Sequence, residues 1–449
     1  MFFSRVKKYS ALIFFTTLVF SIQLYAQESL PESDEKSAQT PSEEELVLSV
    51  EDAVKLAFEG NLSLKQQKIT LNQSLRSKNF SWNSVSPSLS ASASYSSFLP
   101  NQNESDASLT VRGTASLALS PSLWTSIRGA ALSYENQEIS YESAKRTIEL
   151  NVRKAFYGLL YAQENINLQE SNVESSRKQY ESNNAKYTNG TISRLDVLST
   201  QVTYQNAKLN LESARTSWEN DMSSFKQSVG IPQEKKVRLE GNLDDFLNIG
   251  EISVENALES SLTVRQLEKQ IESAKNSLLA TRFSAWAPSL NASYSFSAGK
   301  GSDGKFSTDN PSYGGSITLS ASIPLDGYLP WSSGALSIAS QKDNLAILEL
   351  QLEDAKTSLL VTVESCLKKI EQEKENIKLR ESSIDLAKQT YEMSLTAYNR
   401  GTRDLLSLQN AQDSLFSAQV NLKSEAYTLI STILDLENAI GAEFGTLVK

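Results

Sequence analysis

Residues 187–191 read Tyr-Thr-Asn-Gly-Thr and residues 398–402 read Tyr-Asn-Arg-Gly-Thr, so the same turn occurs twice in the chain. Other stretches recur around it in the same order: Leu-Ser-Val-Glu-Asp-Ala-Val at 48–54 returns at 252–258 as Ile-Ser-Val-Glu-Asn-Ala-Leu, Ser-Pro-Ser-Leu at 86–89 returns at 287–290 as Ala-Pro-Ser-Leu, and Val229-Gly230 returns as Ile440-Gly441. These landmarks define two copies of one unit of roughly 200 residues, which is far longer than a short solenoid repeat. Each copy must therefore be a sizeable assembly of helices and strands.

The duplication predicts a first structural repeat over residues 47–245 and a second over residues 246–449. Ahead of them, residues 1–26 are typical of a secretory signal peptide, with a basic start, an apolar run and Ala26 at a plausible cleavage site. Residues 27–46 are rich in Glu, Ser and Pro, which predicts a disordered acidic lead-in. The chain is thus expected to leave the cytoplasm.

Composition excludes several classes of function. The 449 residues carry 53 acidic and 43 basic side chains, and this negative balance argues against a nucleic-acid partner. There is no histidine and only one cysteine, Cys366, so an intrachain disulfide, histidine-based catalysis and the commonest zinc sites are all excluded. No Gly-rich phosphate loop is present either. We expect no catalytic residues, no metal site and no cofactor, and hence a protein that is not an enzyme.

Each copy also predicts one very long amphipathic helix. In the first copy apolar side chains from Ile148 to Ile166 recur at alternating spacings of four and three, the seam of a coiled coil, and in the second copy they recur every seven residues from Val363 to Tyr398. A helix over about residues 130–186 would be roughly 85 Å long, which requires a rod. An ordinary helix-bundle core is the alternative, but bundle helices average far fewer residues. Shorter helices are expected at about 191–228, 403–439, 50–79 and 254–283.

Two pairs of strands, at 87–120 and 288–323, alternate strictly between apolar and small polar residues. Leu290, Ala292, Tyr294 and Phe296, for example, interleave with serines and an asparagine. Strands of about ten residues with this pattern are typical of an outer-membrane barrel. The alternative is a soluble sheet with one face on a core, but no segment supplies that core and the other face is nearly all Ser and Thr.

Four strands cannot close a barrel by themselves. Their open edges would leave backbone groups unpaired in lipid, so the chain is expected to assemble with copies of itself. Three chains would give twelve strands, an even number wide enough for a lumen, although the sequence permits other counts. Four tryptophans flank the strand ends, as expected for an aromatic belt in a lipid bilayer: Trp82, Trp124, Trp286 and Trp331.

From residue 48 to residue 441 the chain resembles the TolC-like outer-membrane efflux proteins. The resemblance rests on the duplicated order of elements and on local motifs: Ser-Val-Glu-Asp-Ala at 49–53, Pro-Ser-Leu at 87–89 and 288–290, Pro-Leu-Asp-Gly at 324–327, and the turn Tyr187-x-x-Gly190-x-x-Ser193-x-Leu195-Asp196. It implies a mainly α fold with a membrane β-barrel, in which a trimer forms a twelve-stranded barrel in the outer membrane and a coiled-coil helical tunnel across the periplasm. It also implies a passive duct in a tripartite efflux or type I secretion system, with a periplasmic adaptor (membrane fusion) protein and an inner-membrane pump as partners.

The alternative is a periplasmic coiled-coil adaptor or adhesin without channel activity. An adaptor would have one helical hairpin flanked by lipoyl-like and small barrel domains, and no tandem duplication. The observed duplication therefore favours the duct.

The resemblance also implies site residues at the periplasmic tip. Tyr398 and Arg403 match positions that hold the tunnel of well-studied relatives shut by bonding to a first-copy helix, and Asp196 matches the acidic partner. Ser407 and Asn410 stand where relatives often carry two rings of aspartate, a departure, and Asp404 could supply a substitute ring. The alternative is that Arg403 and Asp404 form a solvated turn with a helix cap and that Asp196 merely favours the positive helix start. The turns themselves would meet the adaptor through Gly190, Thr191, Ser193, Leu195, Gly401 and Thr402.

Overall fold

The computed structural model describes residues 46–97, 107–244, 261–302 and 312–447, which belong to one compact unit. The predicted signal peptide at 1–26, nearly all of the lead-in, the loops that join each strand pair and the repeated motif at 252–258 lie outside these residues. Leu46, assigned to the lead-in from its composition, is part of the fold instead, since it begins a short strand.

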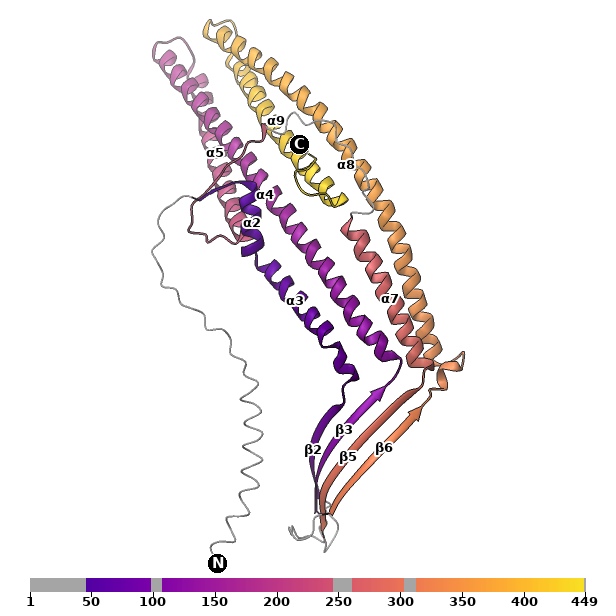
Figure 1. Cartoon of the computed structure of the whole chain (residues 1–449). Helices are drawn as coiled ribbons and strands as arrows, with labels where there is room; N and C mark the ends of the chain where they lie inside the picture. The colour runs from indigo at the N-terminus through magenta and orange to yellow at the C-terminus, as the bar shows by residue number, and fades with distance from the viewer. Residues whose placement is uncertain (1–45, 98–106, 245–260, 303–311, 448–449) are drawn as a thin grey trace, which may run out of the picture. The chain divides into compact units, whose positions relative to one another are not determined.

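Two helical hairpins of identical dimensions form the bulk of the described structure (Figure 1). The first consists of α4 (Ser122–Thr188) and α5 (Arg194–Val229), and the second of α8 (Ser333–Asn399) and α9 (Leu405–Ile440). The long helices have 67 residues each and the shorter ones 36 each, so every residue of the first hairpin has a counterpart 211 positions later. At 1.5 Å per residue the long helices span about 100 Å, which confirms the predicted rods and extends them by several residues.

Shorter helices continue the rods beyond the hairpins. α3 (Leu62–Asn79) packs on α4, and α7 (Leu262–Trp286) packs on both α4 and α8. The helix expected at 50–79 is broken into α2 (Val50–Gly60) and α3, because the Asn61 side chain accepts a hydrogen bond from the backbone N–H of Leu64 and starts a new helix. None of the helices among the described residues combines the length and the apolar character that crossing a membrane requires.

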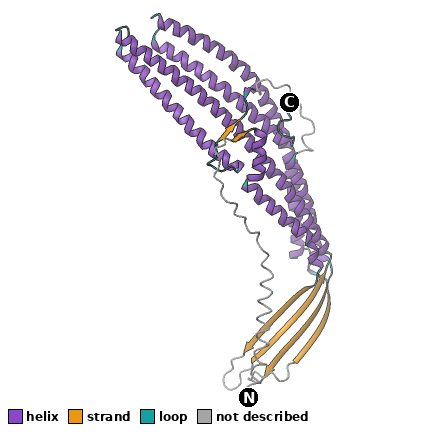
Figure 2. Cartoon of the chain, turned by 60° about the vertical axis from the view of Figure 1, so that its left-hand side comes forward, coloured by secondary structure: helices purple, strands orange, loops and turns teal. Residues whose placement is uncertain are grey.

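The strands form one antiparallel sheet in the order β2-β3-β5-β6, seen side by side in Figure 2. Its members are β2 (Ser88–Ser97), β3 (Ala107–Leu119), β5 (Ser289–Ser302) and β6 (Ser312–Ser322). The central pairing of β3 with β5, from Leu119 opposite Leu290 to Ala107 opposite Ser302, joins the two repeats. β2 and β6 are therefore the edges of the sheet within the described chain.

The two faces of the sheet differ as the alternation predicts. Apolar side chains are uncovered on one face, with Ile317 83% exposed and Leu89 81% exposed. On the other face serine hydroxyls pair across strands, as in Ser88 with Ser116 at 2.7 Å and Ser295 with Ser316 at 2.8 Å. The sheet thus has one apolar and one polar face, and no other described part of the chain covers either of them.

A second, small sheet was not predicted. β1 (Leu46–Leu48) pairs in parallel with β4 (Val237–Leu239), residues far apart in the sequence. Three-residue strands carry no alternation long enough to be recognised. This sheet and α2 cover the junction of α4 and α5, that is, the place where the C-terminal end of α5 packs against α4.

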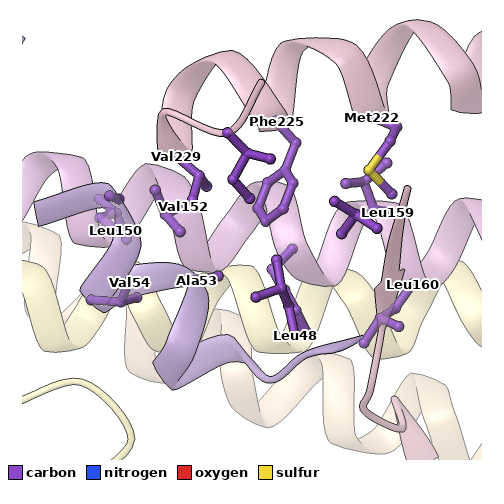
Figure 3. Packing of buried hydrophobic residues seen from close by; sticks show 14 of the residues in the cluster. Leu48, Ala53, Val54, Leu150, Val152, Leu159, Leu160, Met222, Phe225 and Val229 are labelled. Carbon is purple, nitrogen blue, oxygen red and sulfur yellow. The ribbon is translucent and has the colours of Figure 1, made fainter. Parts of the chain in front are cut away.

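The largest hydrophobic cluster lies at that junction (Figure 3). Leu48 and Ala53 meet Val152 and Leu159 of α4 and Phe225 of α5, all of them buried. Gly60 must be glycine here, because a Cβ would lie 2.6 Å from the carbonyl oxygen of Val229. In the second hairpin Val363, Ile370 and Ile377 of the predicted seam are buried against α9, and Cys366 is packed beside them as expected.

Candidate functional site at the turns of the two hairpins

Both hairpins turn through a glycine in the left-handed conformation. Gly190 has φ 73° and Gly401 has φ 75°, values that a side chain would strain. The N–H of Gly190 donates to the carbonyl of Tyr187 at 2.8 Å, and the N–H of Thr191 donates to the carbonyl of Lys186 at 2.9 Å. This pair of bonds ends α4 as a Schellman motif does. Gly401 and Thr402 end α8 with the same two bonds.

The threonine after each glycine adds a further bond. The Thr191 hydroxyl donates to the carbonyl of Lys186 at 2.7 Å, and the Thr402 hydroxyl donates to the carbonyl of Ala397 at 3.0 Å. The four predicted turn residues therefore fix the ends of the long helices and hold the turns in one shape.

The N-terminal caps of α5 and α9 use the same two residue types, serine and aspartate, in opposite order. At the start of α5 the N–H of Asp196 donates to the Ser193 hydroxyl at 3.2 Å, and the N–H of Ser193 donates to the Asp196 carboxylate at 3.3 Å, a capping box. At the start of α9 the cap is Asp404, whose carboxylate accepts from the N–H of Ser407 at 3.2 Å. Ser-x-x-Asp in the first turn has thus become Asp-x-x-Ser in the second.

The exchange places a carboxylate at the very start of α9. Asp404 is exposed, and the bonds from Ser407, with a smaller effect of the Arg403 charge, lower the pKa of its carboxyl below the ordinary value. Asp404 therefore stays ionised at neutral pH. The helix-cap interpretation holds for both Asp196 and Asp404, and their part in a gate stays a prediction.

Tyr398 joins the two hairpins just before the second turn. Its hydroxyl donates to Oδ1 of Asn183 on α4 at 2.9 Å, and Asn183 is fully buried. Burial raises the pKa of this phenol, the bond to Asn183 opposes that shift, and the charge of Asp196 adds a smaller rise. The predicted acidic partner, Asp196, thus acts on Tyr398 only through its charge within the described single chain, because its carboxylate is engaged in the cap.

Lys186 lies beside this bond. Its Nζ stands 4.6 Å from the centre of the Tyr398 ring and donates to Oδ1 of Asn399 at 3.1 Å. Asn183 receives a second bond, from Nε2 of Gln179 at 3.1 Å. Sequence reasoning missed Asn183, Lys186 and Asn399. A signal existed for Asn183, because it continues the seven-residue series of Ile148 at a position where an apolar residue is expected.

The remaining predicted residues are not brought together. Arg403 is exposed, and in the described single chain its guanidinium makes no hydrogen bond or ion pair. Asn410, about two turns beyond Arg403, is also exposed, and Leu195 at the start of α5 is 74% exposed. A bond from Arg403 to a first-copy helix is not present in the described single chain and stays a prediction.

Further polar contacts join the two hairpins a few helical turns away from the hairpin turns. Nε2 of Gln412 on α9 donates to Asn172 on α4 at 3.0 Å, and Nε2 of Gln409 donates to the Thr203 hydroxyl of α5 at 3.0 Å. The contact between repeats is therefore apolar where Ile430 and Leu434 of α9 join the largest hydrophobic cluster, and polar near the turns. Amide and hydroxyl bonds of this kind can exchange for water more readily than a packed apolar seam can.

The duplicated hairpins, the four-stranded sheet with its exposed apolar face and the paired turns define a subunit of an outer-membrane channel with a helical tunnel. The chain belongs to the outer membrane efflux protein family, whose model matches residues 53–230 and again residues 253–442. The predicted family, fold class and outer-membrane location with a periplasmic tunnel are confirmed. The chain serves efflux or secretion across the outer membrane.

Relatives of known name agree with this assignment. Outer membrane protein TolC of Escherichia coli is 22% identical over 345 residues, which cover 73% of this chain and 69% of TolC. The alkaline protease secretion protein AprF of Pseudomonas aeruginosa is 24% identical over 307 residues, 65% of this chain and 60% of AprF.

Solved structures share the fold. The CmeC outer membrane channel of Campylobacter jejuni aligns with a TM-score of 0.74 at 16% identity, over 92% of this chain and 93% of CmeC. The open state of the MtrE outer membrane channel of Neisseria gonorrhoeae aligns with a TM-score of 0.70 at 19% identity, over 93% of this chain and 97% of MtrE. These relatives are channels and a secretion protein, not enzymes.

Proposed function

We propose that the chain is the outer-membrane duct of a tripartite efflux or type I secretion system, in which it works as a homotrimer with a periplasmic adaptor and an inner-membrane pump. The observation that carries this proposal is the sheet. Its two edges, β2 and β6, are unpaired within the described chain, and its apolar face is uncovered. Lipid accepts the apolar face but offers no partners for the unpaired backbone groups of the two edges, so both edges must find strands from other copies.

Three copies would pair every sheet edge with a strand from a neighbour and close a barrel wide enough to hold a lumen. They would give twelve strands, which leaves a lumen that side chains alone cannot fill. The serine-rich face would line that lumen, since hydroxyls are compatible with water. The apolar face would meet the acyl chains.

The hairpins would continue the lumen as a tunnel and close it at the turns. The bond from Tyr398 to Asn183 links the second hairpin to the first within one chain. Arg403, which is exposed and free of partners in the described chain, would reach the next copy. A tunnel held by a few polar bonds can open without unfolding its helices, which suits a passive duct that waits for a pump.

The turns would be the adaptor contact. They present Gly190, Thr191, Ser193, Leu195, Gly401 and Thr402 at the ends of rigid helices, and Leu195 is an exposed apolar side chain there. An adaptor with hairpin ends of its own could pack against such a surface. Adaptor and pump are expected to be supplied by the same cell.

Purification from the outer membrane and reconstitution in planar bilayers test the proposal. We expect oligomers that run as trimers on unheated gels, fall to monomers on heating, and give discrete ion conductance steps. An adhesin or adaptor would show neither the heat-sensitive trimer nor the conductance. A monomer in the soluble periplasmic fraction would contradict the proposal outright.

A further inference from the structure

Glu373 is a carboxyl group in a position that the helical pattern reserves for an apolar side chain. It follows Leu359 and Cys366 at intervals of seven along α8, on the side of the helix that packs against α9. The Glu373 side chain is only 7% exposed. A buried acid needs either a partner or a proton, since isolated ionised carboxylates are costly to bury.

Its neighbour is a second carboxyl group. Glu425 lies on α9, where Arg380 of α8 contacts it, and its bonding and charge are among the causes that raise the pKa of Glu373. Atom Oε2 of Glu373 is buried and has no hydrogen-bond partner among the described residues. Two carboxylates side by side in a dry seam repel each other, so one of them is expected to keep a proton.

The surrounding charges decide which one keeps it. Nη2 of Arg380 lies 3.3 Å from Oε1 of Glu425, which favours the ionised form of Glu425. Lys369, a cation on the same helix, also acts on Glu373, but its effect and that of the Asn376 side chain are smaller than those of burial and Glu425. On α4, the other helix packed against α9, Glu164 faces Lys423 at 3.8 Å, and Lys423 also lies 2.8 Å from Asp244.

These contacts give opposite shifts. Burial first, then the bond to Glu425 and its charge, raise the pKa of the Glu373 carboxyl from 4.5 to about 7. The bond from Glu373 and the Arg380 guanidinium lower the pKa of Glu425. Glu373 is accordingly the proton donor of the pair and Glu425 the acceptor.

The first hairpin shows that the fold does not require these acids. The counterparts 211 positions earlier are Ala162 and Ala214, which line a cavity of about 640 Å³ between α4 and α5. Small residues at this level are therefore compatible with the same helix pairing. The second hairpin has two acids where the first has two methyl groups and space.

We propose that Glu373 and Glu425 hold one proton between them, and that this shared proton makes the packing of α9 against α8 sensitive to pH. With the proton in place, the pair is a hydrogen bond across the seam. When the proton is lost, two negative charges face each other in a largely dry contact. The contact between α8 and α9 then loses this hydrogen bond. The loss does not depend on whether the channel conducts.

The direction of the pH effect follows from the shift of Glu373. Below about pH 4.5 this group is neutral in both the folded and the unfolded chain, so it does not change the free energy of unfolding. Between about pH 4.5 and pH 7 the unfolded chain releases the proton while the folded chain keeps it, so stability falls as pH rises. Glu425, with its lowered pKa, acts the other way and adds stability that is lost only in acid.

The test uses the full-length protein in detergent and follows the loss of helix on heating, at about pH 5 and about pH 8. Glu373→Gln keeps a hydrogen-bond donor towards Glu425 but cannot ionise. We expect its midpoint to fall between the two pH values by less than half as much as the wild-type midpoint. Glu371→Gln, an exposed acid on the same helix, is the matched control and should fall as the wild type does.

A second variant covers the case in which Glu373→Gln does not assemble. Glu373→Ala with Glu425→Ala recreates the alanine pair of the first hairpin, and we expect it to lose the same part of the pH dependence. If either variant keeps the full wild-type fall between the two pH values, the proposal is overturned.

Discussion

The hydroxyl of Tyr398 donates a hydrogen bond of 2.9 Å to Oδ1 of Asn183, a residue 215 positions earlier in the chain. This bond joins the long helix of one hairpin to the long helix of the other near the turns, and Lys186 supports it by packing on the same ring and by donating to Asn399. Asn183 is fully buried, while its amide nitrogen has no partner in the described chain. The junction is thus specific and incompletely satisfied, which suits a contact that has to break.

Weakening this junction should open the channel. Tyr398→Phe removes the donor and Arg403→Ser removes the cation proposed to reach the next copy, so the double variant should conduct more than the wild type in planar bilayers. Each bond is worth about 1 kcal/mol, or a factor of roughly five in an equilibrium. The control is Tyr187→Phe, the counterpart in the first repeat. Unchanged conductance of the double variant would remove the gate assignment.

The carboxylate of Asp404 should attract cations to the tip. Asp404→Asn removes its charge and keeps the cap, because asparagine caps helices as well as aspartate does. We expect lower cation selectivity, measured as a smaller reversal potential in a salt gradient, with thermal stability unchanged. Since the pKa of Asp404 is lowered, wild-type selectivity should persist from about pH 7 to about pH 5. A variant as selective as the wild type would contradict this role.

The exposed apolar face of the sheet should tolerate no charge. Ile317→Arg puts a cation where lipid is expected, at a cost of about 2–4 kcal/mol near the middle of a bilayer. We expect less protein in the outer-membrane fraction and fewer heat-sensitive oligomers. Thr318→Arg, one residue further along β6 and on the opposite face, is the matched control and should insert normally. Equal loss in both variants would show that the two faces do not differ as described.

Arg146 should be important for the end of α9. Its guanidinium donates to the carbonyls of Glu437 at 2.5 Å and Gly441 at 3.2 Å, and also to the carbonyl of Ala442. Arg146→Met removes these bonds, although the carbonyl of Glu437 still accepts from the N–H of Ala442, and we expect about 2–3 kcal/mol of destabilisation in denaturant unfolding. Arg265→Met, which breaks an exposed ion pair of 3.6 Å with Glu142, should cost about 1 kcal/mol or less. Equal costs would mean that the carbonyl contacts of Arg146 contribute little.

Sequence periodicity was sufficient for the large elements. The hairpins and the strand pairs follow from spacings of seven and two, which are local and repeat over many residues. The break at Asn61 was missed although its cap is local, because the same side chain also donates to the carbonyl of Ser228 on α5, a distant contact that no local pattern shows. The pairing of Leu46 with Val237 was missed for the same reason, since no local pattern announces a three-residue strand.

The turn residues could be named from the sequence, but their contacts could not. Gly190 and Gly401 were placed correctly because a left-handed turn needs glycine wherever it occurs. Asp196 was expected to be an acidic partner at the gate, which stays a prediction; within the described single chain its carboxylate caps α5 and Tyr398 bonds to Asn183. Such competition between two possible partners is decided by geometry that one sequence does not contain.

The equal lengths of the two hairpins limit how this molecule can evolve. One extra residue in α4 would turn everything beyond it by about 100° and advance it by 1.5 Å, so Asn183 would no longer meet Tyr398. The same insertion in α8 would restore the level of the two turns but not the pairing of α8 with α9. Viable changes of length should therefore arrive in multiples of seven and in all four helices at once. The length of each hairpin is thus constrained by the length of the other.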